Sequence, residues 1–202
     1  MNCKTVSQLC IGSGLLLSLM SSPARAQEEK GFYTSINLGT GSYSDVTPPG
    51  AATMPYEYGF SYQGGIGYDF GRLRTEVSYT HTTSENTTLS SPIKLGTWML
   101  NALVDFPIEN SKFEPFVGLG YGTTNADATS QCSAGGADTC TDNVGTWGVS
   151  IGAGYEVSET VDLTGTLSYL GFNTIDITDD GVLTQVLDSD TLAFRIGARF
   201  KF

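Results

Sequence analysis

Hydrophobic and polar residues alternate with a period of two along most of the chain after residue 30. The last nine residues, FRIGARFKF, show the pattern clearly, because Phe and Ile share one parity while Arg195, Arg199 and Lys201 share the other. Successive side chains of a strand point to opposite faces, so each such segment predicts a strand with one apolar face. Eight segments of this kind cover residues 32–40, 58–70, 73–82, 95–106, 113–123, 144–157, 161–171 and 191–202.

The connections between these predicted strands alternate in length. The tight ones are residues 71–72, 107–112 and 158–160, and the long ones are residues 41–57, 83–94, 124–143 and 172–190. A tilted strand of about 9–11 residues crosses a bilayer, and most of the predicted strands are at least that long. Short periplasmic turns alternating with long external loops are typical of outer-membrane barrels, in which an even strand number leaves both termini in the periplasm.

The composition of the two faces distinguishes a membrane barrel from a soluble one. In the segment 95–106, Trp98, Leu100 and Val104 share one face, whereas Thr97 and Asn101 lie on the other. In the segment 144–157 the second face is mostly Gly, Ser and Thr. A face this polar and this small does not suit the core of a water-soluble barrel. The sequence therefore predicts an all-β protein, an eight-stranded antiparallel up-and-down transmembrane β-barrel with its apolar face toward lipid.

Aromatic residues fall near both ends of the predicted strands. The external group is Phe60, Tyr79, Trp98, Tyr121, Trp147 and Tyr169, and the periplasmic group is Tyr68, Phe70, Phe106, Tyr155, Phe200 and Phe202. Trp and Tyr gather at the two membrane–water interfaces, so these groups predict the two aromatic belts of a membrane barrel.

The N-terminus predicts export. Lys4, a short apolar stretch over residues 9–20 and the sequence Ala-Arg-Ala before Gln27 resemble a signal peptide, so we expect residues 1–26 to be cleaved and residues 27–202 to form the barrel domain. A lipoprotein anchor at Cys10 is the weaker alternative, since this cysteine precedes most of the apolar stretch. The apolar stretch is too short to span a bilayer as a helix.

The mature chain is acidic and holds two cysteines. It has eight basic and 21 acidic residues, a formal charge of −13, which argues against nucleic acid as a partner. Cys132 and Cys140 are predicted to form a disulfide across a loop, because exported proteins meet an oxidising environment. Two free thiols are the alternative.

Three stretches resemble the small eight-stranded outer-membrane barrels, the group of OmpX, the opacity proteins and the barrel half of OmpA. They are NALVDF at 101–106, EPFVGLGYG at 114–122 and the terminal FRIGARFKF. The resemblance implies that Phe200 and Phe202 act as an assembly signal for the machinery that inserts outer-membrane barrels. Because the chain stops at the last strand, the wall-binding domain of full-length OmpA is not expected.

Charged residues at inward parity predict a plugged lumen. Eight strands enclose an interior just wide enough for side chains, and buried charges persist only when they are paired. We therefore expect an ion-pair network in the periplasmic half, with Asp69 facing Arg74 across the turn at 71–72. A narrow ion path lined by the same charges is the alternative. The ten residues are Asp69, Arg74, Glu76, Asp105, Glu114, Glu156, Asp162, Arg195, Arg199 and Lys201.

No motif for catalysis or metal binding is convincing. His81, the single histidine, is predicted to face lipid or headgroups near the external end of its strand, which does not suit a general base beside a nucleophile. The period-two glycines at 118–122 and 65–67 precede no helix and so do not form a phosphate cradle. The aspartates of residues 172–190 could hold Ca²⁺ or Mg²⁺, but a solvated acidic loop is the commoner explanation.

These patterns predict a non-enzymatic integral outer-membrane protein without a cofactor, a monomer that gives envelope structure and displays four external loops. Its expected partners are outer-membrane lipids, lipopolysaccharide, the barrel assembly machinery and an external ligand whose identity the sequence does not reveal. A small low-conductance pore with a charged lumen is the alternative function, and an enzyme acting on outer-leaflet lipid is a third.

Overall fold

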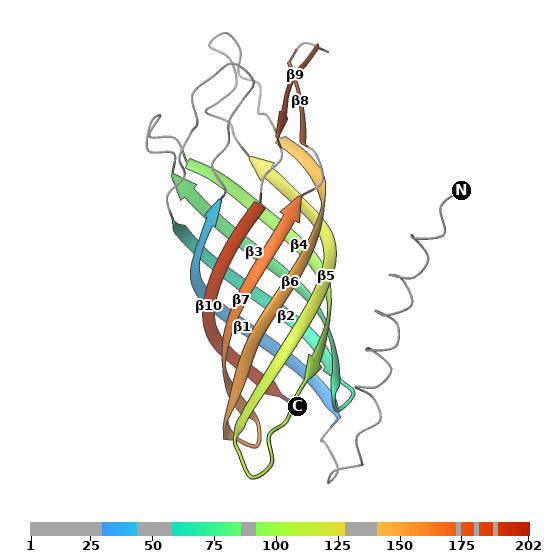
Figure 1. Cartoon of the computed structure of the whole chain (residues 1–202), viewed down its shortest axis with the longest axis vertical. Coiled ribbons are helices and arrows are strands. Elements are labelled where there is room, and N and C mark those ends of the chain that lie inside the picture. Colours follow the sequence, from blue (N-terminus) through green and yellow to red (C-terminus); the bar gives the residue numbers. More distant parts are fainter. Residues whose placement is uncertain are drawn as a thin grey trace, which may run out of the picture.

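The computed structural model describes residues 30–43, 58–85, 92–127, 141–172, 175–179, 182–187 and 190–202. Eight antiparallel strands close into a barrel in the order β1-β10-β7-β6-β5-β4-β3-β2 (Figure 1). The barrel strands are β1 (Gly31–Tyr43), β2 (Gly59–Asp69), β3 (Leu73–Glu85), β4 (Pro92–Asp105), β5 (Phe113–Asp127), β6 (Thr141–Ser158), β7 (Val161–Phe172) and β10 (Asp190–Lys201). The predicted fold class is thus confirmed. Among the described residues there is no helix long and apolar enough to span a membrane.

The first and last strands close the barrel. β1 pairs with β10 from Tyr33 opposite Lys201 to Tyr43 opposite Thr191. At one end of this seam the Phe202 amide donates to the Phe32 carbonyl at 2.9 Å. The terminal segment FRIGARFKF is therefore the closing strand of the barrel, so no edge of the barrel is left unpaired.

The two ends of the barrel differ. We call the end with the short connections 70–72, 106–112 and 159–160 the turn end, and the opposite end the loop end (Figure 1). The C-terminus lies at the turn end. The turn between β2 and β3 contains Gly71, which has φ 110°, a conformation that favours glycine, and whose amide donates to the Asp69 carboxylate at 2.7 Å.

The barrel strands reach further toward the loop end than the apolar alternation predicts. β3 continues to Glu85, β4 starts at Pro92, and β5 and β6 stay paired as far as Asp127 and Thr141. These extensions are mostly polar, so they carry no alternation of apolar residues, while the β-branched Thr in three of them still favours an extended backbone.

The connection over residues 172–190 was predicted as a loop without strands, and that prediction was wrong. It contains two further strands, β8 (Ile175–Asp179) and β9 (Val182–Leu187), which pair with each other outside the barrel at the loop end (Figure 1). The sequence between them includes Asp180-Gly181, a pair that favours hairpin turns. The many aspartates of this segment hid its short apolar runs.

The faces of the barrel are inverted relative to a soluble protein. Large apolar side chains cover the outside; Leu119, for example, is 67% exposed and Ile66 is 65% exposed. Buried side chains in the interior are mostly polar, including Ser61, Thr124 and Arg195. An apolar exterior around a polar interior is stable only when lipid surrounds the barrel.

Candidate functional site

The turn-end half of the lumen is closed by buried ion pairs, and the tightest one joins neighbouring strands. Arg74 on β3 donates from two nitrogens to both carboxylate oxygens of Asp105 on β4, each at 2.6 Å. Both side chains are at least 95% buried. A bidentate Arg–carboxylate pair is the strongest geometry for such a contact, so it ties the two side chains in place.

A second group of charges forms around Arg199 on β10. Its guanidinium donates to Asp162 on β7 at 2.7 Å and to Glu114 on β5 at 3.0 Å. Lys201 also lies 3.2 Å from the other oxygen of Asp162. Because β5 and β7 are separated by β6 in the barrel, Arg199 reaches across the lumen and joins strands that are not neighbours.

Two aromatic rings fill the space between the arginines. The guanidinium carbons of Arg74 and Arg199 lie 5.7 and 5.8 Å from the centre of the Tyr33 ring, and Arg74 also lies 5.1 Å from the ring of Phe116. At this range the negative face of a ring attracts a cation. Tyr33 is only 1% exposed, so the rings help to exclude water from this half of the lumen.

Inward glycines make the room that these long side chains occupy. A Cβ on Gly67 would collide with the Tyr33 ring, and a Cβ on Gly152 would collide with the ring of Phe116. A Cβ on Gly65 would stand 2.7 Å from the carboxylate carbon of Glu76. The glycine pattern of β2 and β6 is therefore part of the lumen packing.

Two predicted members of the network, Asp69 and Glu156, do not make the contacts that were expected, whereas Glu76 lies in the lumen as predicted. Asp69 is the register partner of Arg74, but the Arg74 guanidinium donates to the Asp105 carboxylate, and Asp69 instead accepts a hydrogen bond from the Gly71 amide. Glu76 accepts a hydrogen bond from Ser35 at 2.9 Å. We therefore correct the predicted pairing of Asp69 with Arg74, since the short turn points the Asp69 carboxylate at the backbone.

Glu156 also departs from the prediction. Its side chain is exposed, and among the described residues it forms no ion pair. Glu156 lies directly opposite the inward Asp162, so its predicted parity holds, but it is the last β6 residue before the pairing with β7 shifts, at the open end of the barrel. Glu156 instead lines a wide cavity of about 490 Å³ at the turn end, which is the mouth of the barrel.

Arg195 lies further from the turn end and is 2% exposed. It donates to the Ser61 hydroxyl at 3.2 Å and to the Ser168 hydroxyl at 3.3 Å. With Arg74, Glu76 and Arg199 it borders a cavity of about 70 Å³, which has room for a few water molecules. The described part of the lumen therefore contains a small charged chamber that could hold water.

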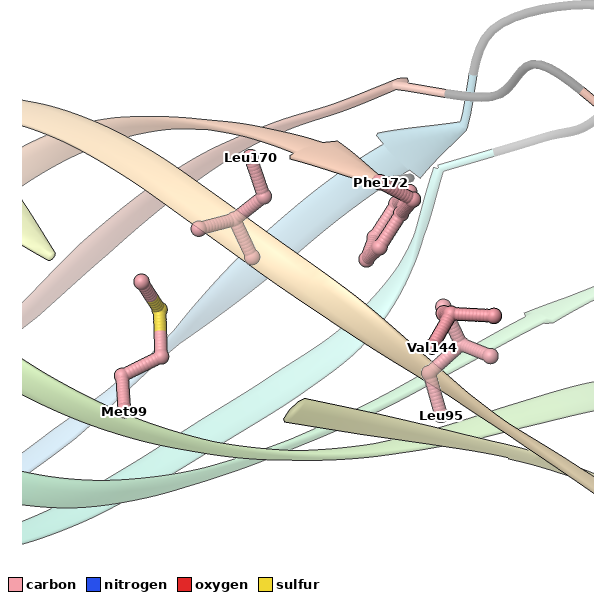
Figure 2. Packing of buried hydrophobic residues seen from close by; sticks show 5 residues of the cluster. All are labelled: Leu95, Met99, Val144, Leu170 and Phe172. Carbon is pink, nitrogen blue, oxygen red and sulfur yellow. The ribbon is translucent and has the colours of Figure 1, made fainter. Parts of the chain in front are cut away.

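An apolar cluster lies on the loop-end side of this chamber, and the sequence analysis did not predict it. Leu95 and Met99 of β4, Val144 of β6, and Leu170 and Phe172 of β7 meet inside the barrel (Figure 2). Each is at most 9% exposed. Met99 and Leu170 also border the chamber, so the cluster adjoins it directly. All five sit at inward parity, and this was the signal that could have revealed them.

Hydroxyl groups surround the apolar cluster. Thr97, Thr124 and Thr146 form a chain of hydrogen bonds across three strands, with oxygen separations of 2.8 and 2.6 Å. Ser61 and Thr82 pair at 3.0 Å on the neighbouring strands β2 and β3. These contacts satisfy the polar groups of the wall locally, so the apolar side chains can pack in the middle of the lumen.

The remaining predicted residues lie outside the lumen or outside the described residues. His81 is half-buried, stacks on Tyr62 with ring centres 5.1 Å apart, and its Nε2 lies 3.4 Å from the Thr83 hydroxyl. Phe200 and Phe202 are exposed at the turn end.

Some predictions fall on residues that the structure does not describe. These are residues 1–29, which include the predicted signal peptide, and Cys132 and Cys140. In the described ranges, no three acidic, His or Cys side chains are grouped to hold a metal ion.

Comparison with known proteins agrees with this geometry. Residues 13–200 match the model of the family described as outer membrane protein beta-barrel domain. The chain belongs to this outer-membrane β-barrel family. Members of this family reside in the bacterial outer membrane, so this β-barrel is placed there too. A search of the curated proteins found no match.

Solved structures of small outer-membrane barrels share the fold. Neisserial surface protein A, from Neisseria, aligns with a TM-score of 0.65 and 24% identity over 87% of this chain and 100% of its own. The outer membrane protein OprG of Pseudomonas aeruginosa aligns with a TM-score of 0.55 and 16% identity, over 88% and 98%. A major outer membrane protein of Thermus thermophilus aligns with a TM-score of 0.54 and 16% identity, over 85% and 99%. At these identities the likeness concerns the fold alone.

Proposed function

We propose that this barrel is a non-enzymatic outer-membrane protein that gives the envelope structure and displays its loop-end segments at the cell surface for interaction or adhesion. The observation that carries the proposal is the filled lumen. Ion pairs and rings occupy its turn-end half, and the cluster around Met99 and Phe172 occupies the lumen beyond the chamber. A lumen filled in this way favours a scaffold over a conduit.

The proposed orientation places the turn end in the periplasm and the loop end outside the cell. Short turns on the periplasmic side and longer connections on the external side are the usual arrangement of such barrels. The similarity to Neisserial surface protein A, whose name places it at the surface, supports the same orientation. Function in this class of protein resides in the segments that the rigid barrel holds apart.

Trimming a loop-end segment tests the structural role and the display role separately. A variant with residues 173–189 replaced by a short Gly-Ser linker should assemble normally and keep the envelope resistant to detergent, while losing adhesion of the producing cells to the surfaces that they colonise. A matched variant, in which a short Gly-Ser linker replaces the turn at 107–112, should keep adhesion. If the trimmed barrel assembles and the cells still adhere, the display role is wrong.

A low-conductance pore is the second candidate, and the charged chamber beside Arg195 favours it. Ions could cross only if both closed regions of the lumen rearranged. Substitution of Arg199 by Ala would then alter the conductance of the protein in a bilayer. Under our proposal it lowers the folding stability instead, because it leaves Asp162 and Glu114 without their shared cation.

An enzyme acting on outer-leaflet lipid is the third candidate. His81, the single histidine, stacks on Tyr62 on the outward side of β3, and the hydroxyl beside it belongs to Thr83 on the same outward face. We propose that it takes no part in catalysis. Lipid extracted from cells that overproduce the wild type or the His81→Ala variant should then show the same composition as lipid from cells that lack the protein.

A further inference from the structure

The charges of the loop-end segments are strongly one-sided. Residues 41–57, 83–94, 124–143 and 172–190 contain eleven acidic residues and a single basic one, Lys94. Lys94 lies near the start of β4, has an exposed side chain, and shares the outward parity of Trp98. The one cation of this region is therefore directed to the lipid-facing side of the barrel.

The strand register surrounds Lys94 with hydrogen-bond donors. Thr83 lies directly opposite it on β3, and His81 lies opposite Gly96, two residues further along β4. The ring of Tyr79 leans over Gly96, since a Cβ added at this glycine would stand 2.7 Å from the Tyr79 hydroxyl. Three donor side chains of β3 thus share the outward face with the ammonium group of Lys94.

The height of this group above the aromatic belt matches the lipid headgroups. Gly96 and Lys94 lie two and four residues beyond Trp98, about 7 and 13 Å along a strand that rises about 3.3 Å per residue. A tilt of about 40° reduces this to about 5 and 10 Å along the membrane normal. The headgroup layer beyond the hydrocarbon is about 5–8 Å thick. His81 lies within that layer, and the flexible stem of Lys94 can reach back into it.

We propose that this outward cluster binds the phosphate group of a membrane lipid in the leaflet around the loop end. The cluster consists of Tyr79, His81, Thr83 and Lys94. A phosphate offers only acceptors and negative charge, and these side chains offer a phenol, an imidazole N–H, a hydroxyl and an ammonium. Stacking on Tyr62 fixes the His81 ring, and the tilted Tyr79–Trp98 pair, with ring centres 4.9 Å apart, provides an aromatic surface below for the lipid's apolar part.

One residue opposes this site. Asp127 is the register partner of Lys94 on β5, which puts an acidic residue beside the cation in the sheet. The site depends on neither the identity of a surface ligand nor the side of the membrane that the loop end faces. It is therefore independent of the proposed function.

The two tryptophans of the chain provide a direct test. Trp98 borders the site, whereas Trp147 lies on β6 away from it, and the two are similarly exposed at 56% and 42%. Trp147→Phe and Trp98→Phe variants isolate each fluorophore. Each variant would be reconstituted in phosphatidylcholine vesicles. One set of vesicles contains brominated phosphatidic acid, and the other contains brominated phosphatidylcholine. In both lipids the bromine sits near the headgroup end of the acyl chains. Quenching then reports which lipid occupies the contact position.

At Trp98 we expect phosphatidic acid to be favoured over phosphatidylcholine about fivefold, which is the effect of about one cation near a lipid phosphate. At Trp147 we expect the two lipids to be bound about equally. Lys94→Gln should abolish the preference at Trp98, Lys94→Arg should retain it, and Asp127→Asn should raise it. Lys112→Gln, which removes an exposed cation at the turn end, is the matched control and should leave it unchanged. Heat-modifiable migration on a gel checks that each variant is folded.

Equal quenching by the two lipids at Trp98, or a preference that survives Lys94→Gln, would overturn the site. Inorganic phosphate in the buffer should reduce the preference no more than sodium chloride of the same ionic strength does. A specific loss in phosphate buffer would overturn the assignment to a lipid, since the cluster would then favour a soluble anion.

Discussion

Replacing Asp105 by Asn removes the negative partner of Arg74 while changing the volume of the side chain very little. In the folded barrel two hydrogen bonds of 2.6 Å join Arg74 to Asp105, and neither side chain is more than 5% exposed. The variant therefore keeps the shape of the lumen and leaves a guanidinium charge without its bidentate carboxylate. The perturbation is electrostatic, and it falls within the buried ion-pair network.

The expected loss of folding stability is about 3 kcal/mol. Removing one partner of a buried ion pair costs about 3–5 kcal/mol, because the remaining charge stays away from water. The lower end applies here, since the rings of Tyr33 and Phe116 still face the Arg74 guanidinium and contribute about 1 kcal/mol. Replacing both members with Met and Leu should cost far less than the single change, because no uncompensated charge remains.

Urea unfolding of the barrel in phosphatidylcholine vesicles, followed by tryptophan fluorescence, measures this loss. Glu156→Gln is the matched control: it also neutralises a carboxylate, but one that is exposed at the mouth, and it should change the free energy of unfolding by no more than about 0.5 kcal/mol. The reasoning is refuted if Asp105→Asn has an effect as small as that control. It is also refuted if the double variant is as unstable as the single one.

Three further changes follow from the packing. Gly67→Ala should lower the free energy of unfolding by about 1–3 kcal/mol in the same assay, because its Cβ meets the Tyr33 ring. Gly165→Ala should cost nothing, because a Cβ there would meet no atom within 4 Å. Equal losses in the two variants would contradict this. Phe172→Ala should lower the free energy of unfolding by about 3 kcal/mol. It should still leave planar bilayers silent, because the ion pairs close the lumen, and stable openings would contradict this. Phe202→Ser should change the free energy of unfolding by at most about 0.5 kcal/mol, since Phe202 is 80% exposed. It should nevertheless reduce the amount of folded barrel in cells. Unchanged assembly would contradict the role of Phe202 as an assembly signal.

The barrel could be predicted from the sequence because one physical pattern repeats eight times. Lipid outside and polar groups inside force the period-two alternation, and tight turns such as 71–72 fix where each strand ends. Parity also placed Arg74, Asp105 and Arg199 in the lumen. The pattern weakens where lipid no longer imposes it, and for that reason the Thr-rich strand extensions and the β8–β9 hairpin were missed.

The partners within the lumen could not be predicted, because parity gives a side chain's face and not its height in a tilted barrel. Asp69 and Arg74 are true register partners, yet Arg74 reaches the next strand to Asp105. Glu156 has the predicted inward parity, yet it stands at the open mouth of the barrel, too near the end of its strand to be buried. Leu95 and Phe172 were inward by parity, but only the closed barrel shows that they meet.

The central claim is that the lumen is sealed, and the most direct measurement is the single-channel conductance of the refolded mature chain in a planar bilayer. Folding would first be checked by heat-modifiable migration, and the Arg199→Ala variant would be recorded beside the wild type. We expect a silent bilayer for the folded wild type over long recordings. Reproducible openings of the wild type that change in conductance when Arg199 is replaced would contradict it and make the protein a channel.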